Sequence, residues 1–299
     1  MDGIINVYKP AGMSSFSCVK QVARLLGEKK AGHGGTLDPQ ATGILPVFLG
    51  KATKMADFIH EYDKSYKAGF VLGKVSDTYD IWGECVTSAQ TQVLESIDEE
   101  RIRSVLKSFV GECIQVPPAY SAVKIQGTPA YKLAREGKNV EIKSRVVNIF
   151  TIELVSYDKE TKRGIFDVTC SKGTYVRSIC HDLGKKLGCG ACMCYLERTS
   201  YGPFDLANSC TPEECDIQKL LPCDFLLQTV PVAELDDECA KKYASGNYKK
   251  ISVQDISQPV GENMRFLRLY NRGSLFALAK TEYVMGADYL ELTPFKFFG

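Results

Sequence analysis

A glycine-rich run at residues 31–54 places one carboxylate, that of Asp38, in a constrained loop. The run contains five glycines and two prolines, and Pro39 directly follows Asp38. Glycines let a backbone approach another molecule closely, and a following proline restricts the residue before it to extended geometry. A carboxylate presented by such a stiff loop could act as a nucleophile, although an ordinary turn with a solvated aspartate would have the same composition.

A run of cysteines is the second group of residues whose spacing could do chemistry. It contains Cys189, Cys192 and Cys194, with Cys180 and His181 just upstream. Thiolate and imidazole groups at short spacing can bind zinc. The chain has 12 cysteines in 299 residues, however, and they are spread irregularly through apolar stretches, which favours reduced and mostly buried thiols.

The N-terminal sequence and the hydropathy indicate in which compartment the protein resides. Its first residues lack the basic start and apolar run of a secretory signal, and no window approaches the roughly 18 uninterrupted apolar residues of a membrane span. We therefore expect a cytoplasmic protein.

The net charge of +1 hides a block pattern. Lys and Arg outnumber Asp and Glu in residues 1–75, 120–186 and 241–299, whereas residues 76–119 and 187–240 are acidic. Folding could bring the three basic blocks together as one face for a nucleic acid, although scattered surface charge would give the same count.

The elements that must position Asp38 follow from hydrophobic periodicity. Residues 14–27 predict a short helix that buries Val19, Val22, Ala23 and Leu26, with Ser14 or Ser15 as the N-cap and Gly27 as the stop. Residues 98–111 and 175–188 also predict amphipathic helices, and residues 3–10, 65–73, 146–158 and 163–171 predict strands. We expect an α+β domain with a mainly antiparallel sheet flanked by helices.

A composition change near residues 205–230 indicates a second unit. This stretch is acidic and interrupted by prolines and cysteines, and short strand patterns follow it to the end of the chain. We predict one domain over residues 1–229 and a small β domain over residues 230–299, with a boundary uncertain by about ten residues.

The Asp38 run also resembles the catalytic motif of the TruB pseudouridine synthases, Gly-His-x-Gly-[Ser/Thr]-Leu-Asp-Pro-x-Ala-[Thr/Ser]-Gly-[Val/Ile]-Leu-Pro. Further similarity lies in Lys9-Pro10, in the strand around Tyr66, in residues 117–137, in Gly173-Thr174-Tyr175-Val176-Arg177 and in residues 196–204. These elements occur in the order of the family across roughly the first 205 residues.

The resemblance implies the pseudouridine synthase fold and the isomerisation of uridine 55 in the TΨC loop of transfer RNA. This reaction gains no group and changes no oxidation state, so no cofactor is expected. Asp38 would be the catalytic aspartate and would act as a nucleophile. Whether it attacks the ribose, adds to the uracil ring or removes a ribose proton stays open. Arg177 would pair with Asp38 and hold its charge in a dry pocket.

The same resemblance implies a pocket for a uridine that is flipped out of its stack. Tyr66 and Tyr175 would line it, and Tyr66 could also move a proton. His33 and Leu196 would lie near the extruded base. Phosphate contacts would come from the basic blocks, with the following candidates: Lys64, Lys67, Lys124, Lys132, Arg135, Lys138, Lys143 and Arg145.

The resemblance also informs the remaining alternatives. It implies that the cysteine run binds no metal, and that Glu197 stands where arginine is common, which puts an RNA contact from that position in doubt. A small C-terminal domain would resemble the PUA-like RNA-contacting domain of the family. We expect a monomer that needs no protein partner.

Two alternative functions remain. One is a dyskerin-like subunit that needs a guide RNA, and the other is an RNA-binding or chaperone module without catalysis. The early first strand and the end at FKFFG favour the stand-alone enzyme.

Overall fold

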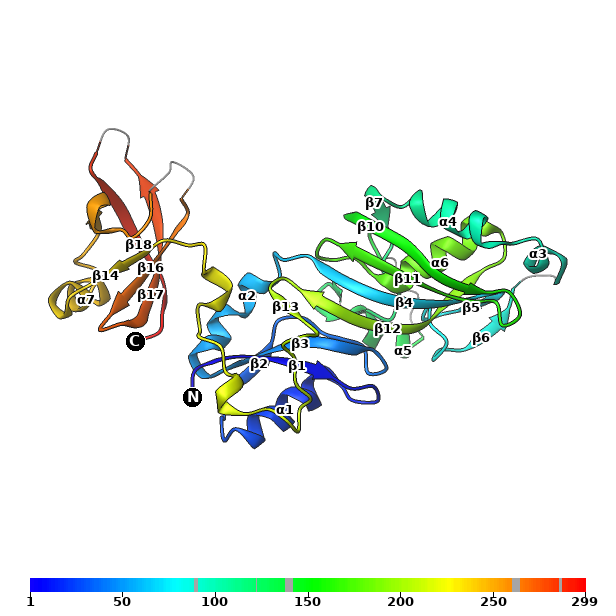
Figure 1. Ribbon diagram of the computed structural model, residues 1–299, viewed down its shortest axis with the longest axis horizontal. Coiled ribbons are helices and arrows are strands. Elements are labelled where there is room, and N and C mark those ends of the chain that lie inside the picture. The colour runs from blue at the N-terminus through cyan, green and yellow to red at the C-terminus, as the bar shows by residue number, and fades with distance from the viewer. Residues whose placement is uncertain (89–90, 122, 138–141, 260–263, 285–286) are drawn as a thin grey trace.

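The computed structural model describes residues 1–299 apart from 89–90, 122, 138–141, 260–263 and 285–286. Within the described residues, nine strands form one large sheet and five form a smaller sheet at the other end of the molecule from α3 (Figure 1). No helix in this part of the chain is long and apolar enough to cross a membrane.

The large sheet forms the centre of the molecule. Among the described strand pairs, β12 and β3 are the only parallel neighbours in it, so the expected mainly antiparallel sheet is confirmed. In sheet order its strands are β1 (Gly3–Lys9), β3 (Thr42–Leu49), β12 (Ala191–Tyr201), β4 (Lys64–Leu72), β11 (Arg163–Cys170), β10 (Arg145–Asp158) and β7 (Gly111–Gln115), with β2 (Ala31–His33) on β3 and β13 (Phe204–Asp205) on β12.

Helices pack against this sheet: α1 contacts β2 and β3, α4 contacts β10, and α6 contacts β12 and α4. The α-helices are α1 (Ser15–Leu25), α2 (Ala56–Ile59), α3 (Thr91–Glu95), α4 (Glu99–Lys107), α5 (Ala130–Arg135), α6 (Val176–Leu187) and α7 (Asp237–Ala244). Short 3-10 turns lie at η1 (Gly50–Met55), η2 (Ile217–Lys219), η3 (Phe225–Leu227) and η4 (Val253–Asp255).

Helix α1 illustrates how local sequence sets these elements. The Ser14 hydroxyl accepts from the amide of Ser17 at 3.0 Å, which settles the N-cap between the two serines proposed. Gly27 has a φ of 67°, a left-handed conformation that ends helices at low cost in glycine. Val19 and Val22 are buried on the inner face as predicted.

The smaller sheet confirms the expected C-terminal β structure. Its core also contains Ala240 and Tyr243 of α7. Its strands run in the order β14 (Val232–Glu234), β16 (Phe266–Asn271), β17 (Ser274–Tyr283), β18 (Tyr289–Phe297) and β15 (Lys250–Ser252). Two short hairpins, β5 (Lys74–Ser76) with β6 (Cys85–Thr87) and β8 (Lys124–Ile125) with β9 (Thr128–Pro129), complete the described strands.

The two sheets share an apolar cluster. Leu278 and Phe298 of the C-terminal part pack with Ile4 and Met55 of the N-terminal part. Beside this cluster the buried Arg268 donates to Asp224 at 2.6 Å. Residues 206–231 connect the sheets and return to the first strand, where Ile4 and Leu221 form a bridge. The small sheet is therefore fixed against the large one rather than loosely attached.

Candidate active site

The loop that carries Asp38 lies between β2 and β3 and is tied to the surrounding structure at several points. The Ser15 hydroxyl donates to the carbonyl oxygen of Leu37 at 2.9 Å and accepts from the Leu37 amide at 2.8 Å. Tyr201 donates to the carbonyl oxygen of Gly34 at 2.8 Å, and Arg198 donates to that of Gly35 at 3.1 Å. These side chains fix the backbone on the N-terminal side of Asp38.

Lys9 holds the C-terminal side of the loop by hydrogen bonds from inside the protein. Its fully buried ammonium donates to the carbonyl oxygens of Pro10 and Met13 at 2.8 Å and to that of Pro39 at 3.1 Å. Burial lowers the pKa of Lys9 to about 8, while the negative charge of Asp38 partly offsets this effect. The lysine thus joins the end of β1 to the residue that follows Asp38.

Arg177 contacts Asp38 directly. Its Nε lies 3.2 Å from Oδ2 of Asp38, and its side chain is buried, whereas that of Asp38 is 42% exposed. The contact uses one nitrogen and one oxygen, so the pair is not the bidentate fork that arginine can form with a carboxylate. Arg177 is the second residue of α6, and from there its guanidinium reaches the Asp38 loop while the carboxylate stays open to solvent.

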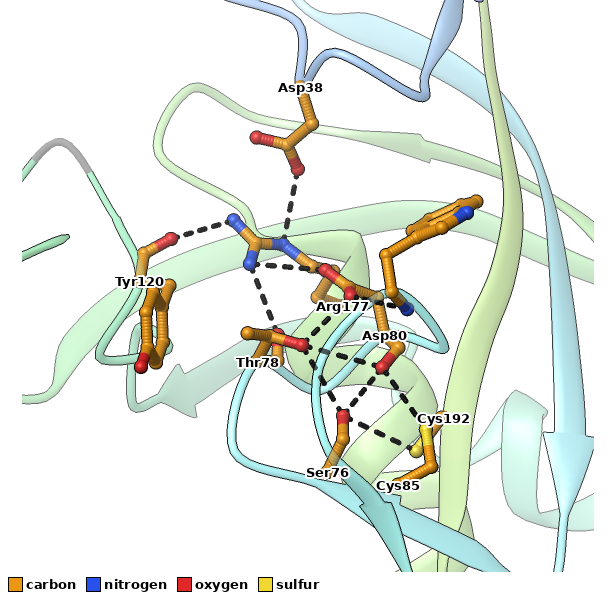
Figure 2. A network of polar contacts seen from close by, with 9 residues as sticks. Asp38, Ser76, Thr78, Asp80, Cys85, Tyr120, Arg177 and Cys192 are labelled. Atoms are coloured by element: carbon orange, nitrogen blue, oxygen red, sulfur yellow. Dashed lines mark hydrogen bonds and ion pairs between the residues drawn. The ribbon is translucent and has the colours of Figure 1, made fainter. Parts of the chain in front are cut away.

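Asp80 is a residue that the sequence analysis missed. Its Oδ2 lies 3.4 Å from Nη1 of Arg177, and its Oδ1 accepts from the Thr78 hydroxyl at 2.8 Å and from the Trp82 amide at 3.1 Å. Arg177 also donates to the carbonyl oxygens of Thr78 at 3.1 Å and Tyr120 at 2.9 Å. Figure 2 shows the guanidinium between Asp38 on one side and Asp80 on the other.

A second layer of contacts holds Asp80. Ser76 donates to the carbonyl oxygen of Asp80 at 2.6 Å, and the Cys85 thiol approaches the same oxygen at 3.7 Å (Figure 2). Tyr79, just before Asp80, has a φ of 63° and stacks on His181 of α6 with ring centroids 4.0 Å apart. The turn that presents Asp80 to Arg177 is therefore anchored on the same helix as Arg177.

Tyr66 lies on β4, directly opposite Arg198 of β12. Only 8% of Tyr66 is exposed, and burial raises the pKa of its phenol to about 12, against a smaller lowering effect from Arg198. Arg198 itself is buried and donates from Nε to the carbonyl oxygen of Ile44 at 2.7 Å. Gly43 is required beside it, because a Cβ on Gly43 would overlap the backbone of Arg198.

His33 and Leu196 lie on the two strands next to the loop. Nδ1 of His33 accepts from the amide of Gly35 at 3.2 Å, and burial, then the charge of Arg198, lowers the pKa of His33. The accepting Nδ1 carries no proton, so the neutral ring holds its proton on Nε2. Leu196 is 8% exposed, and its carbonyl oxygen is 3.5 Å from the Thr42 hydroxyl.

Tyr175 is the N-cap residue of α6 and is held from the β7 side. Its amide donates to Oε1 of Gln115 at 2.7 Å, and its carbonyl oxygen accepts from Nε2 of the same side chain at 3.0 Å. The guanidinium of Arg145 lies 5.4 Å from the centre of its ring. Of the proposed pair of aromatic residues, Tyr66 therefore shares the surroundings of Arg198 and Asp38, whereas Tyr175 is joined to Arg145.

The proposed phosphate-facing cations differ in their surroundings. Lys64 does not face solvent freely, because its ammonium lies 4.2 Å from the centre of the Tyr201 ring and burial lowers its pKa to about 8. Lys124, Lys132 and Lys143 are exposed, and Lys138 lies outside the described residues. No group of three or more His, Cys, Asp or Glu side chains in the described residues is arranged to hold a metal ion.

Comparisons with known families agree with the motif. Residues 23–176 match the model of the N-terminal domain of TruB family pseudouridylate synthases, and residues 177–221 match that of the C-terminal domain of tRNA pseudouridylate synthase B. The chain is 42% identical to tRNA pseudouridine synthase B of Alkaliphilus oremlandii, over 88% of this chain and 89% of that protein. It is 41% identical to the protein of the same name from Clostridium acetobutylicum, over 91% of this chain and 92% of that protein.

Solved structures show the same fold over nearly the whole chain. A chain in the crystal structure of a Cbf5-Nop10-Gar1 complex superimposes with a TM-score of 0.70 at 26% identity, covering 99% of this chain and 84% of that chain. A chain of an archaeal box H/ACA sRNP Nop10-Cbf5 complex gives 0.68 at 25% identity, with coverages of 99% and 85%. The similarity thus extends through the small C-terminal sheet.

Proposed function

The chain belongs to the TruB family of pseudouridylate synthases, and from this membership we propose that it isomerises uridine 55 in the TΨC loop of transfer RNA to pseudouridine. The relatives named tRNA pseudouridine synthase B, about 40% identical over most of the chain, support transfer RNA as the substrate. The contact that carries the proposal is the 3.2 Å pair between Arg177 and Asp38 in a loop that leaves the carboxylate half open.

The reaction breaks the bond between uracil N1 and ribose C1′ and forms a bond between C5 and C1′. The hydrogen on C5 is lost and N1 gains one, so the atoms balance without an oxidant or a second substrate. In our proposal the Asp38 carboxylate starts bond cleavage, either as the nucleophile or as the base that removes a ribose proton. A substrate with deuterium at ribose C2′ separates the two routes, since only proton removal makes that substrate slow.

Tyr66, Tyr175, His33 and Leu196 form the proposed uridine pocket. The buried Tyr66 ring offers a flat face for the detached uracil, and its high pKa keeps the phenol protonated near neutral pH, so that it can donate a proton. Turning the uridine out of its stack costs a few kcal/mol, which stacking and phosphate contacts offset. Exposed cations at Lys124, Lys132 and Lys143 are the proposed phosphate contacts.

We assign residues 1–229 to catalysis and residues 230–299 to a PUA-like unit that contacts RNA. The exposed Lys241 and Lys249 lie in this second unit. Replacing both with glutamate should weaken transfer RNA binding and reduce its salt dependence. Lys107→Glu, on an exposed position of α4, is the matched control and should leave binding unchanged.

The direct test is incubation of the protein alone with unmodified transfer RNA, followed by mapping of pseudouridine. Product at position 55, absent with Asp38→Asn although binding persists, supports the proposal. Product at a different uridine would contradict the assigned position. Binding without product from the unaltered protein would support an RNA-binding or chaperone module instead.

A guide-dependent subunit is the second candidate, because the fold matches Cbf5 chains over 99% of this chain. The higher identity to the tRNA pseudouridine synthase B proteins favours the stand-alone enzyme. We propose a cytoplasmic monomer of 33.1 kDa, which light scattering after gel filtration measures directly. Activity only after addition of a guide RNA and partner proteins would establish the second candidate.

A further inference from the structure

A pair of thiols that the proposed reaction does not use lies on the segment connecting the two sheets. Cys210 is hydrogen-bonded to the first strand on both sides, since its amide donates to Asn6 at 3.1 Å and its carbonyl oxygen accepts from Tyr8 at 2.8 Å. The yellow segment that contains it runs back past β1 in Figure 1. Cys210 is therefore held by backbone pairing and not only by side-chain packing.

A tight turn brings Cys215 back to Cys210. The amide of Glu214 donates to the carbonyl oxygen of Thr211 at 3.0 Å, and Pro212 occupies the second position of this turn, where its fixed φ is favoured. The two sulfur atoms, which flank the turn, lie 3.6 Å apart. Their proximity is thus set by the local backbone of residues 210–215, with Cys210 fixed to β1.

The two thiols are not equivalent. A hydrogen bond from the Cys215 thiol, with a smaller contribution from Lys219, lowers the pKa of Cys210, whereas the same hydrogen bond and burial raise the pKa of Cys215. Each thiol also has a carbonyl oxygen within reach, that of Thr211 at 3.4 Å for Cys215 and that of Asn6 at 3.7 Å for Cys210, and ionisation of Cys210 would leave its sulfur to accept from Cys215. Cys210 has the character of a nucleophile and Cys215 that of its partner.

We propose that Cys210 and Cys215 form a redox-active dithiol that a hydroperoxide oxidises to an intramolecular disulfide. The Cys210 thiolate attacks one peroxide oxygen, the O–O bond breaks, and Cys210 becomes a sulfenic acid while hydroxide leaves. The Cys215 sulfur then attacks the Cys210 sulfur and displaces the sulfenic oxygen, which leaves as water. Two thiols and one hydrogen peroxide give one disulfide and two waters, and an added dithiol reverses the step.

Access to the pair is through the turn. The side chains of Cys210 and Cys215 are 4% and 6% exposed, but Glu213 and Glu214 between them are exposed. A molecule as small as hydrogen peroxide therefore needs only local opening of the turn. Cys18 belongs to the same apolar core, where burial raises its pKa to about 11, which disfavours it as a competing nucleophile.

The test uses the full-length reduced protein and hydrogen peroxide. We expect the titrable thiols to fall from 12 to ten and to return to 12 after dithiothreitol. Trypsin releases residues 199–219, a peptide whose two cysteines are Cys210 and Cys215, and cleavage after Glu213 or Glu214 separates them. The fragments should stay joined until reduced. Twelve remaining thiols, or a bond to Cys18, would overturn the proposal.

Single replacements test the assigned roles of the sulfurs. Cys215→Ser should accumulate a sulfenic acid on Cys210 that dimedone traps, and Cys210→Ser should give neither the adduct nor the disulfide. Cys239→Ser removes a half-buried thiol on α7 and should leave disulfide formation unchanged. An unmodified Cys210 in peroxide-treated Cys215→Ser would contradict the assignment of Cys210 as the nucleophile. None of these measurements requires RNA, so they are independent of the proposed isomerase activity.

Discussion

Arg177 approaches Asp38 through Nε alone, at 3.2 Å. Its two terminal nitrogens are left for Asp80 and for the carbonyl oxygens of Thr78 and Tyr120. The guanidinium is consequently held from the side opposite to Asp38, so that one oxygen of the catalytic candidate remains available to a substrate. This division of one cation between two carboxylates leads to the first two predictions.

Arg177→Lys should lower the rate constant for pseudouridine formation by about 100-fold or more, the scale found when a charge-stabilising group is lost from an active site. A lysine ammonium is a point charge and cannot span Asp38, Asp80 and two carbonyl oxygens together. Single-turnover assays measure the rate, and thermal unfolding checks the fold. Arg163→Lys, at the exposed first position of β11, is the matched control and should retain full activity. A full rate in Arg177→Lys would show that a single positive charge is enough at this position.

Asp80→Asn should reduce the same rate constant while leaving transfer RNA affinity within about twofold, a difference of less than 0.5 kcal/mol. The asparagine can still accept from Thr78 and Trp82, but Arg177 loses its second carboxylate and turns further toward Asp38. Breaking a buried pair can cost about 3–5 kcal/mol, so unfolding must be followed in parallel. An unchanged rate in a folded variant would assign Asp80 a purely structural role.

Tyr66→Phe separates stacking from proton transfer. The phenyl ring keeps the flat face, so transfer RNA binding should persist, while the rate should fall by about 100-fold if the phenol moves a proton, the lower end for acid–base groups. Filter binding and single-turnover rates give the two quantities. Loss of binding together with rate would instead indicate that the hydroxyl contributes to the pocket before any chemistry. Tyr157→Phe, a half-buried ring on β10, is the control.

His33 should make stability sensitive to acid. Its folded-state pKa is below the ordinary value of 6.5, so the unfolded chain takes up a proton near pH 6.5 before the native protein does. Stability should therefore be fully present above this pH and fall as pH drops through the interval below it. His33→Gln should flatten this dependence in urea unfolding. His181, whose pKa is also lowered by burial, should leave a residual slope, which His181→Gln tests separately.

The sequence predicted the elements and the motif but not the full site. Asp38 stood out because its neighbours are glycines and prolines, and Arg177 was found through resemblance. Asp80 was missed because an acid in a polar stretch between short strands looks like a solvated turn. Only the packing of α6 against that turn, 97 residues later in the chain, buries it beside Arg177.

Lys64 shows the converse case. Counted by charge, it belongs to a basic block that could meet phosphate, although on β4 it lies two residues before the buried Tyr66 and so on the same face of the strand. The Tyr201 ring comes from β12 and covers its ammonium, which no local pattern could predict. The pairing of Arg177 with Asp38 was expected through resemblance, whereas the contacts of Asp80 with Arg177 and of Lys64 with Tyr201 join distant segments and left no local sequence pattern.

The position of β12 between β3 and β4 has a consequence for biosynthesis. Arg198 and Tyr201, which hold the backbone of the Asp38 loop, are made about 160 residues after it. A nascent chain must therefore leave the ribosome almost to the end of the large sheet before this loop can acquire its final form. We expect stalled chains ending near residue 190 to be cleaved rapidly by protease at residues 34–41, and chains that expose residue 221 to resist.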